Sequence, residues 1–247
     1  FLLTGFVINE LTYDHQYNDY ERIYRVGVRA DMQGKLSSYA VSPLPMAPTL
    51  ADEAPEIERA SRFMFAHLVY EVGDDKIFGI TNYAADTNFL RIFNQEYIEG
   101  SLTALDEPNR VVLTESIAKR LFGDTYVVGK MVKAGDFELE VGAVIKDRPL
   151  NTHFTFDVLV SWNTFKRNDA WDNINAYTYV KLYPNVDIKA ADTTIASIQN
   201  DYLKLISEEW ELKAEPILER IDKIHTSGYL DEDFAPKRSK NYVYIIL

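Results

Sequence analysis

The chain has 247 residues, with a hydrophobic share of 47% and an aromatic share of 13%, so it can bury the core of one large domain or of two smaller ones. Its net charge of −12 argues against nucleic-acid binding, which needs clustered basic residues, and disfavours docking on anionic lipid. Cysteine is absent, which excludes disulfides, thiolate metal sites and cysteine nucleophiles but fixes no cellular compartment.

An apolar run stands at each end of the chain, at residues 1–8 and 242–247. Neither run could span a bilayer by itself, because a spanning helix needs about 20 apolar residues. Each run is either the stub of a longer membrane span or a terminal element packed on a core, and short apolar runs do not decide between the two. The polar, tyrosine-rich stretch from Asn9 to Arg22 predicts a helix or helical extension.

The first third of the chain predicts strands and one short helix. Residues 23–30 alternate apolar and polar side chains, as a strand does. Pro43, Pro45 and Pro48 fit only the entry and first turn of a helix that begins near Ser42, and Pro55 ends it. Further strands are predicted at residues 57–65, 68–72 and 77–83, with a hairpin turn at residues 73–76.

A second unit is predicted to begin near Ala85. Residues 111–113 form a buried strand, and Thr114 caps a helix that stops at Gly123. The unit also contains a short amphipathic helix at residues 87–93 and a strand pair at residues 127–132 and 137–145, and residues 147–149 close it.

The last third predicts strands around one long helix. That helix runs from Ile188 to about Ser207 with a single apolar face. A loop containing Trp162, Trp171 and Asn173 joins the predicted strands at residues 154–160 and 176–182. The remaining predicted elements are strands at residues 154–160 and 176–182, a segment at 212–221, Ile224 and His225, a charged hairpin at 231–233 and the final apolar run.

No histidine pair has the spacing of a metal site on a helix. The four histidines are His15, His67, His153 and His225, and none lies three or four residues from another. Lone histidines are more often packing or surface residues. The sequence spacing excludes a metal-binding pair on one helix, but it does not exclude a metal site formed by histidines that the fold brings together.

Carboxylates cluster at three places in the sequence, namely Asp74 and Asp75, then Glu208, Glu209 and Glu211, then Asp231, Glu232 and Asp233. Turns or solvated helix ends are expected there, so no catalytic role is predicted. A weak calcium site at residues 231–233 is conceivable, although the spaced ligands of a calcium loop are missing. No nucleophile elbow, P-loop or dinucleotide fingerprint occurs. We therefore predict no catalytic, cofactor-binding or metal-binding residues.

The predicted second unit carries a specific resemblance. Residues 108–124, followed by 128–130 and 141–144, strongly resemble the extracytoplasmic domain of MacB/FtsX-type ABC transporter permeases. That family shows a strand, a helix ending in Leu-Phe-Gly as at residues 121–123, a Val/Ile-Gly-Lys turn and a strand reading Val-x-Gly-Val. Ala143 departs from this pattern, because the family usually has Val or Ile directly after the glycine. Segments that agree in the same order are residues 10–14, 21–26, 55–58, 86–93 and 224–227.

The resemblance implies an α+β fold with a body in two parts. Residues 24–84 plus 151–207 would form a Porter-like subdomain built from βαβ units, and residues 85–150 an inserted, Sabre-like mixed α/β subdomain. Residues 1–23 would be a membrane-proximal N-terminal extension, and residues 208–247 would return to a second transmembrane helix. The resemblance thus favours the stub interpretation of the apolar ends and predicts that they lie near each other, on one face.

The resemblance also implies a function without chemistry: a non-catalytic periplasmic domain of an ABC transporter permease that uses no cofactor. It would be a loop domain between two transmembrane helices, on the periplasmic side of the inner membrane. By mechanotransmission it would couple cytoplasmic ATP hydrolysis to export or release of a substrate, or to regulation of a partner. Implied partners are its own transmembrane helices, a separate cytoplasmic ABC ATPase and a second permease copy, with a periplasmic or outer-membrane protein as a further candidate and no nucleic acid.

Two other functions compete with this one. An extracytoplasmic ligand-sensing domain of a two-span membrane receptor is the main alternative, and an envelope enzyme is the third. Trp162, Trp171 and the tyrosine-rich N-terminal stretch are candidate partner contacts, although packing is the simpler interpretation of each. The isolated domain is expected to be monomeric.

Overall fold

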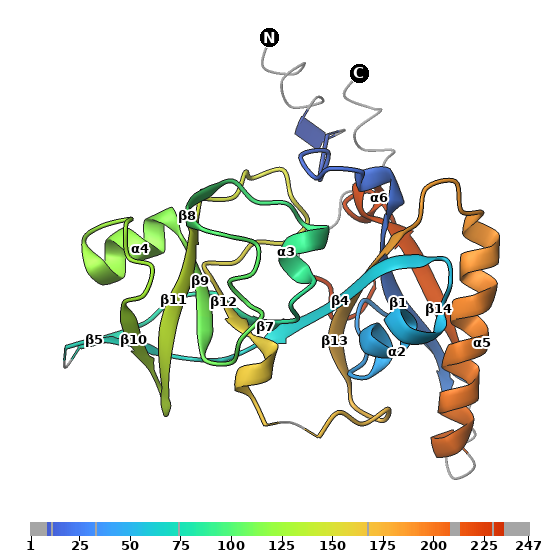
Figure 1. Ribbon diagram of the computed structural model, residues 1–247. Helices are drawn as coiled ribbons and strands as arrows, with labels where there is room; N and C mark the ends of the chain where they lie inside the picture. Colours follow the sequence, from blue (N-terminus) through green and yellow to red (C-terminus); the bar gives the residue numbers. More distant parts are fainter. Residues whose placement is uncertain are drawn as a thin grey trace. The chain divides into compact units, whose positions relative to one another are not determined.

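The computed structural model describes residues 9–10, 12–32, 34–73, 75–166, 168–207, 213–228 and 230–234. The chain divides into two compact units (Figure 1). Unit 1 is Phe1–Arg62, Asn151–Phe154 and Asp169–Leu247, and unit 2 is Phe63–Leu150 and Thr155–Asn168. Both predicted apolar ends lie outside the described residues. Within the described part of the chain, no helix combines the length and the apolar character of a membrane span.

Unit 1 is built on strands in the order β14-β1-β13-β4. β1 is antiparallel to both β13 and β14, so β13 and β14 are parallel with β1 between them. The chain order β1-α2-β4 and β13-α5-β14 is the split βαβ arrangement of ferredoxin-like sheets. The elements are β1 (Ile23–Met32), α2 (Met46–Glu53), β4 (Ile57–Phe65), β13 (Ile174–Leu182), α5 (Ile188–Ser207) and β14 (Lys213–Arg220), with β2 (Lys35–Tyr39) on β1 and β3 (Ser42–Pro43) on β13.

Two helices cover one face of this sheet (Figure 1). Val26 of β1 and Val180 of β13 are fully buried and belong to the same apolar cluster as Leu50 of α2 and Ile195 of α5. Because successive side chains of a strand point to opposite faces, the residues that precede Val26 and Val180 stand on the other face. We call this second face the open face of the sheet. Arg25 and Tyr179 therefore belong to it.

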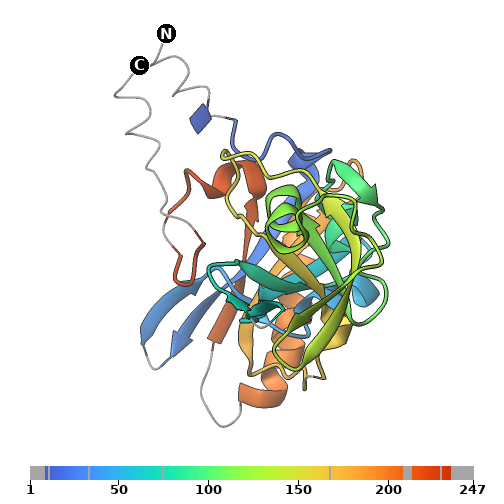
Figure 2. The ribbon, with the colours of Figure 1, turned by 90° about the vertical axis from the view of Figure 1, so that its left-hand side faces the viewer.

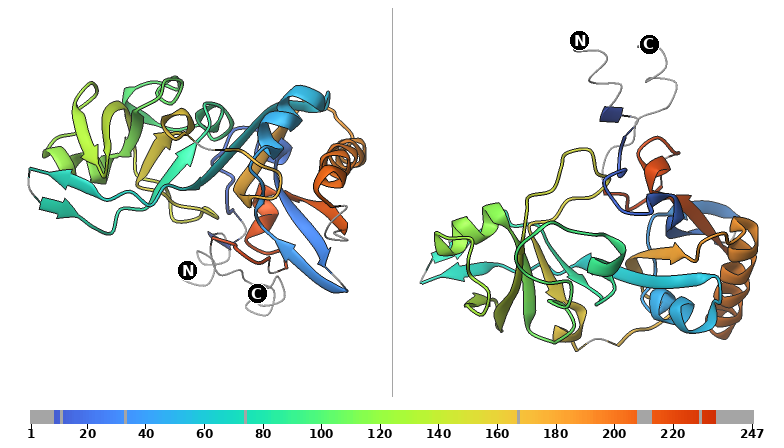
Figure 3. Two further views of the ribbon diagram at one scale, coloured as in Figure 1. Left: turned by 90° about the horizontal axis from the view of Figure 1, so that it is seen from below. Right: turned by 45° about the horizontal axis from the view of Figure 1, so that its top comes forward.

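Unit 2 has its own strand order, β7-β12-β9-β11-β10-β5-β6, with β8 on β11. The pairs β9–β11 and β7–β12 are parallel and the other pairs are antiparallel, so the sheet is mixed. α4 packs its apolar side on this sheet (Figure 3). The elements are β5 (Tyr70–Val72), β6 (Asp75–Ile77), β7 (Asn82–Ala85), α3 (Phe89–Ile92), β8 (Tyr97–Gly100), β9 (Arg110–Thr114), α4 (Glu115–Phe122), β10 (Met131–Ala134), β11 (Phe137–Ile145), β12 (Val158–Ser161) and η2 (Trp162–Thr164).

The bounds of the compact units differ from the predicted subdomain bounds in two stretches. Residues 63–84 and 155–168 group with unit 2, because Phe63–Phe65 at the end of β4 pair with β7, and β12 pairs with β7 and β9. The assignment of the two units to Porter-like and Sabre-like subdomains stays a prediction.

The cap of α4 differs from the predicted one. Thr114 occupies the N-cap position, but its side chain makes no capping hydrogen bond. Asp147 does so instead: its Oδ1 accepts a hydrogen bond from the Ser116 backbone N–H at 3.0 Å. The stop at Gly123 lies where the sequence predicts it, in a left-handed conformation with φ 72°.

Two other predicted elements are interrupted by left-handed residues. Asp14 and Asp19 have φ 62° and 58°, so residues 12–19 form turns before η1 (Tyr20–Arg22), and the predicted N-terminal helical extension is wrong for these residues. Gly79 has φ 73° and separates β6 from β7, where a single strand is predicted. Ile224 ends a short helix, α6 (Ile221–Ile224), and α5 has the predicted bounds.

β1 extends into a hairpin with β2, shown in blue in Figure 2. Gly27 lies in β1 where the backbone of Tyr39 approaches it. A Cβ atom on Gly27 would be only 2.4 Å from the Tyr39 carbonyl oxygen. The close approach of these two backbone segments therefore requires glycine at this position.

We predict that Gly27→Ala destabilises the protein by about 1–3 kcal/mol, because the added methyl group displaces backbone rather than a flexible side chain. Gly228→Ala is the matched control, since nothing lies within 4 Å of its added Cβ, and it should change stability by less than about 0.5 kcal/mol. Urea-induced unfolding measures both. Equal midpoints for the two variants would contradict the prediction.

Candidate functional site

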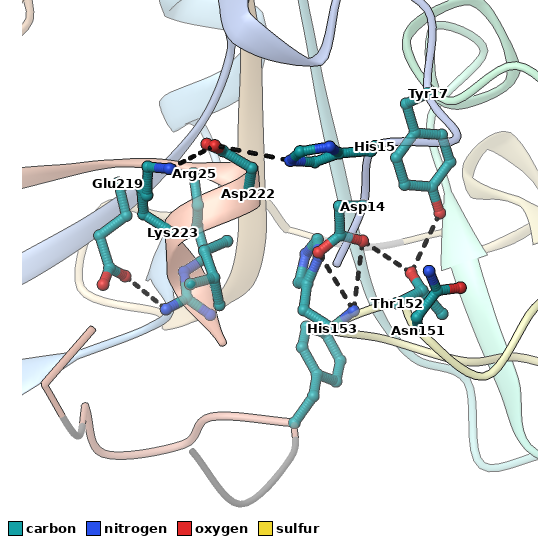
Figure 4. A network of polar contacts seen from close by, with 12 residues as sticks. Asp14, His15, Tyr17, Arg25, Asn151, Thr152, His153, Glu219, Asp222 and Lys223 are labelled. Carbon is teal, nitrogen blue, oxygen red and sulfur yellow. Dashed lines mark hydrogen bonds and ion pairs between the residues drawn. The ribbon is translucent and has the colours of Figure 1, made fainter. Parts of the chain in front are cut away.

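Three segments of unit 1 meet in a polar network on the open face of its sheet (Figure 4). We call residues 9–22, as far as they are described, the strap, and residues 230–234 the tie. The third segment is Asn151–Phe154. Strap and tie stand at opposite ends of the described chain, so their attachment decides how both ends are held.

Arg25 fastens the tie to the sheet. Its fully buried guanidinium donates to Asp233 Oδ1 at 2.8 Å and to Glu219 Oε2 at 2.5 Å. In the strand register Arg25 stands directly opposite both Glu219 and Tyr179. Burial alone would lower the pKa of Arg25, but Tyr179, Asp233 and Glu219 together outweigh burial and raise it. The arginine therefore stays charged.

Backbone and aromatic contacts add to this attachment. The Asp231 carbonyl accepts a hydrogen bond from the Ala40 backbone N–H at 2.9 Å. Tyr177 Oη donates to the Glu232 carbonyl at 2.8 Å, and the rings of Tyr177 and Phe234 lie 3.7 Å apart. The tie is thus held by β2 and β13 as well as by Arg25.

Asp14 fastens the strap. Its buried carboxylate accepts hydrogen bonds from Thr152 Oγ1 at 2.8 Å and from the His153 backbone N–H at 3.2 Å. The backbone N–H of Asp14 donates to the Asn151 carbonyl at 3.0 Å. Tyr17 adds a hydroxyl contact to Thr152 at 3.3 Å. The strap is therefore bound to the segment Asn151–Phe154 through both backbone and side chains.

His153 connects Asp14 to the sheet. Its Nδ1 lies 2.8 Å from Asp14 Oδ2, and its Nε2 lies 2.7 Å from Tyr179 Oη. The Nδ1 contact has the distance of an ion pair but not the geometry of a hydrogen bond. Burial raises the pKa of Tyr179 well above its usual value, so its hydroxyl keeps its proton. The direction of the hydrogen bond between Nε2 and Tyr179 Oη depends on the tautomer of the ring.

His225 holds the start of the strap. Its Nε2 lies 2.8 Å from Glu10 Oε2, and both side chains are buried. The ring of Tyr13 stacks on the His225 ring at a centroid distance of 3.6 Å, with the planes 3° apart. The strap is therefore attached at a second place, just after α6.

Three positive or protonatable groups lie close to the carboxylate of Asp222 in α6. Arg220 Nε donates to it at 2.6 Å, Lys223 Nζ lies at 2.7 Å and His15 Nε2 at 4.0 Å. Burial would raise the pKa of Asp222, but the hydrogen bonds from Arg220 and Lys223 outweigh it, so the pKa lies below its ordinary value. Asp222 is therefore ionised at neutral pH.

The structure brings together histidines that the sequence leaves apart. His15, His153 and His225 all belong to the strap or bind it, whereas His67 lies in unit 2, where its ring stacks on Phe65. Spacing carries no signal for this grouping, because Asp14 and His153 are 139 residues apart. Among the described residues, no group of three or more histidines and carboxylates is arranged to hold a metal ion.

The charged hairpin at residues 231–233 is predicted to be solvated, and for Asp233 this is wrong. Its side chain is 3% exposed, because both carboxylate oxygens bind the guanidinium of Arg25. Asp231 and Glu232 are exposed, as is Asp75 at the β5–β6 hairpin. Asp74, Glu208, Glu209 and Glu211 lie outside the described residues.

The two tryptophans that are candidate partner contacts are both packed. Trp162 is buried in η2. Trp171 stacks on Tyr202 of α5 at a centroid distance of 4.5 Å. More exposed aromatic side chains occur in unit 2, where Phe65 and Phe78 line an open pocket of about 410 Å³. Sequence reasoning missed these two, since both lie in or beside predicted strands.

The chain matches a family model described as the MacB-like periplasmic core domain, over residues 1–198. This match covers most of the chain, and the chain belongs to that family. A search of curated proteins found no match.

Solved structures share the fold, and they confirm the predicted α+β class. A domain of a putative permease protein from Porphyromonas gingivalis has a TM-score of 0.70 at 21% identity, covering 93% of this chain and 99% of that one. The periplasmic region of MacB from Actinobacillus actinomycetemcomitans has a TM-score of 0.58 at 16% identity, covering 84% and 94%. The extracellular domain of the noncanonic ABC-type transporter YknZ from Gram-positive bacteria has a TM-score of 0.55 at 15% identity, covering 78% and 99%.

We predict that Arg25→Met destabilises the protein by about 3–5 kcal/mol, because it leaves the buried Asp233 without its charged partner. Arg29→Met is the matched control four residues along β1. Arg29 is half exposed and its ion pair with Glu215 spans 3.9 Å, so its loss should cost less than about 1 kcal/mol. Urea-induced unfolding gives both values, and an equal loss in both variants would refute the role of Arg25.

Asp222→Asn should lower stability at pH 7 by about 1–3 kcal/mol, since the change removes a buried charge-assisted acceptor. The folded-state pKa of Asp222 lies below its ordinary value of 3.8. Its contribution is therefore present above that value and is lost as the pH falls through the folded-state pKa. Chemical denaturation at a series of pH values should show the difference from wild type shrinking below pH 3.8.

Asp201→Asn is the control, because Asp201 is exposed and its ion pair is with Lys204 of its own helix, 3.2 Å away. Its effect at pH 7 should be under about 1 kcal/mol. A difference for Asp222→Asn that stays constant from pH 7 to acid would contradict the assignment.

Proposed function

We propose that this chain is the extracytoplasmic domain of an ABC transporter permease of the broader MacB/FtsX type, a loop domain between two transmembrane helices on the periplasmic side of the inner membrane. The family match over residues 1–198 supports this proposal. Two structural neighbours, described as a putative permease and an ABC-type transporter, agree with it.

We propose further that the domain transmits motion. The main support is that the strap and the tie are both attached to one face of the same sheet. The strap leads directly into β1, and the tie is fastened to the same strand through Arg25. A displacement at either end therefore acts on one hydrogen-bonded sheet instead of on a flexible loop. We propose that ATP hydrolysis in a cytoplasmic ATPase moves the transmembrane helices, and that the strap and tie pass this motion to unit 1.

The burial of the Asp14–His153–Tyr179 group supports a function without catalysis. A carboxylate, an imidazole and a hydroxyl in this order resemble an acid–base relay. All three side chains are closed off from solvent, with exposures of 0%, 2% and 0%, so no substrate reaches them. We interpret the group as a fastening.

The partners within this proposal are the chain's own transmembrane helices, the cytoplasmic ATPase and a second permease copy. A periplasmic or outer-membrane protein is a further candidate, and the substrate is left unassigned. We propose no cofactor for this chain.

The location is tested by cysteine labelling of the full-length protein. The chain has no cysteine, so Lys76→Cys in the exposed strand β6 introduces a single reactive thiol into the domain. We expect a membrane-impermeant maleimide to label this variant in intact spheroplasts, because the domain faces outward. Val112→Cys, fully buried in β9, is the matched control and should label only after denaturation.

Labelling of Lys76→Cys only after the membrane is broken would overturn the location.

The coupling is tested with Glu21→Cys on the exposed side of the strap, in the transporter reconstituted with its ATPase. Its labelling rate should change when ATP is added, and the change should be lost when Arg25→Met is also present. A rate independent of ATP, together with a kinase or methyl-accepting segment in the full-length protein, would instead favour a receptor.

A further inference from the structure

The chain passes between the two compact units at four places, which we call crossings. In chain order the crossings follow Arg62, Leu150, Phe154 and Asn168. The second and third crossings enclose Asn151–Phe154, which groups with unit 1 although the chain on both sides of it groups with unit 2. This short segment is therefore bonded to unit 2 at both of its ends.

The strap holds this segment through side chains and backbone (Figure 4). The Asp14 carboxylate accepts a hydrogen bond from Thr152 Oγ1 at 2.8 Å, and the hydroxyl of Tyr17 lies 3.3 Å from the same oxygen. The backbone N–H of Asp14 donates to the Asn151 carbonyl at 3.0 Å, and the Asn151 side-chain amide donates to the Thr12 carbonyl at 3.2 Å. Each of these bonds joins the strap to a segment whose neighbours on both sides belong to unit 2.

At the third crossing the chain changes units within two residues. The ring of Phe154 lies 6.2 Å from that of Tyr179 in unit 1, whereas the ring of Phe156 meets that of Phe89 in unit 2 edge-on at 5.8 Å. Thr155 stands between these two buried rings, is exposed and belongs to no helix or strand. A loop residue between two packed anchors is the kind of position at which hinges form.

The second crossing has the same arrangement. Within unit 2, Asp147 accepts a hydrogen bond from the Ser116 backbone N–H at 3.0 Å, and the guanidinium of Arg148 lies 4.9 Å from the centre of the Phe156 ring. Leu150 follows in chain that is neither helix nor strand, and it is 89% exposed. The segment held by the strap is thus bounded on each side by an exposed residue, with residues packed in unit 2 just beyond.

Arg62 holds the first and fourth crossings. It is the last residue of unit 1 before the first crossing, and Asp169 is the first residue of unit 1 after the fourth. The buried guanidinium of Arg62 lies 2.7 Å from Asp169 Oδ2 and donates to the Leu44 carbonyl. β4 also runs through the first crossing as an unbroken strand. Two crossings are therefore held by a residue of the unit 1 sheet, and the other two by the strap.

We infer that the strap controls the freedom of unit 2 through Asn151–Phe154. A body held at one pair of connections can turn about them, and a second pair held elsewhere removes that freedom. While the strap binds the segment, all four crossings are held. When the strap releases it, unit 2 turns about the two crossings that Arg62 holds, with Leu150 and Thr155 as the bending residues.

This deepens the proposed function and rests on it for its meaning, since it names the part of the domain that a motion entering through the strap reaches. Its test uses the 247-residue chain in solution, without membrane or ATPase. It can therefore fail while the location and ATP-coupling experiments succeed, and the reverse.

The test measures distances between the two units at neutral pH. The chain has no cysteine, so the exposed positions Ser197→Cys on α5 and Lys119→Cys on α4 take one spin label each, and double electron–electron resonance gives the distribution of distances between them. Asp14→Asn removes the charge that binds Thr152, and asparagine tolerates the left-handed conformation of position 14, with φ 62°. We expect the fraction of molecules outside the main wild-type distance to rise about fivefold or more, the lower end of a typical coupling between sites.

Asp19→Asn is the matched control. Asp19 is also a left-handed aspartate of the strap, but its carboxylate binds Arg22 at 2.8 Å and Lys181 of β13 at 2.7 Å. This variant should keep the wild-type distribution. If Asp14→Asn does not fold, Tyr17→Phe removes only a hydroxyl from the strap side of the contact and should change the distribution in the same direction.

A label pair within unit 2, Glu107→Cys with Lys119→Cys, reports whether that unit stays intact, and its distribution should be the same in every variant. Three results would overturn the inference. The first is a wild-type distribution between the units in Asp14→Asn. The second is an equal change in Asp19→Asn, because the contacts to Asn151–Phe154 are then not the cause. The third is a changed distribution within unit 2, because that indicates unfolding instead of turning.

Discussion

The burial of one positive charge, that of Arg25, imposes a constraint on the rest of unit 1. Removing a guanidinium from water costs several kcal/mol, and only well-placed carboxylates offset that cost. One of them, Glu219, comes from the neighbouring strand and stands opposite Arg25 in register. The other, Asp233, is 208 residues away, so the end of the described chain must return to the sheet for Arg25 to be paired.

The two faces of this sheet hold the structure in different ways. On the covered face, α2 and α5 bury aliphatic side chains, and this burial is non-directional. On the open face, ion pairs, an imidazole and hydroxyls have specific partners at specific distances. The covered face therefore supplies stability, whereas the open face decides where the strap and the tie are placed.

Sequence periodicity was sufficient for elements whose determinants are local. The alternation in β1, the apolar face of α5 and the glycine stop of α4 depend on neighbouring residues, and all three elements form as predicted. The prediction of an N-terminal helical extension was wrong because Asp14 and Asp19 adopt left-handed conformations, which no local sequence pattern predicts. Asp233 was misjudged for a related reason: a run of three acidic residues predicts a solvated turn unless a distant arginine is known.

The candidate site was beyond sequence reasoning because it depends on register. A period of two tells which residues share a face of a strand, but not which strands are neighbours. Once β1 lies between β13 and β14, Glu219, Arg25 and Tyr179 form one row, and His153 with Asp14 extends it. Residue types suited to proton transfer are thus assembled where their side chains are closed off from solvent. The buried hydrogen bonds join the strap and the tie to residues of this sheet and of the segment Asn151–Phe154, so one sheet holds both segments of the chain.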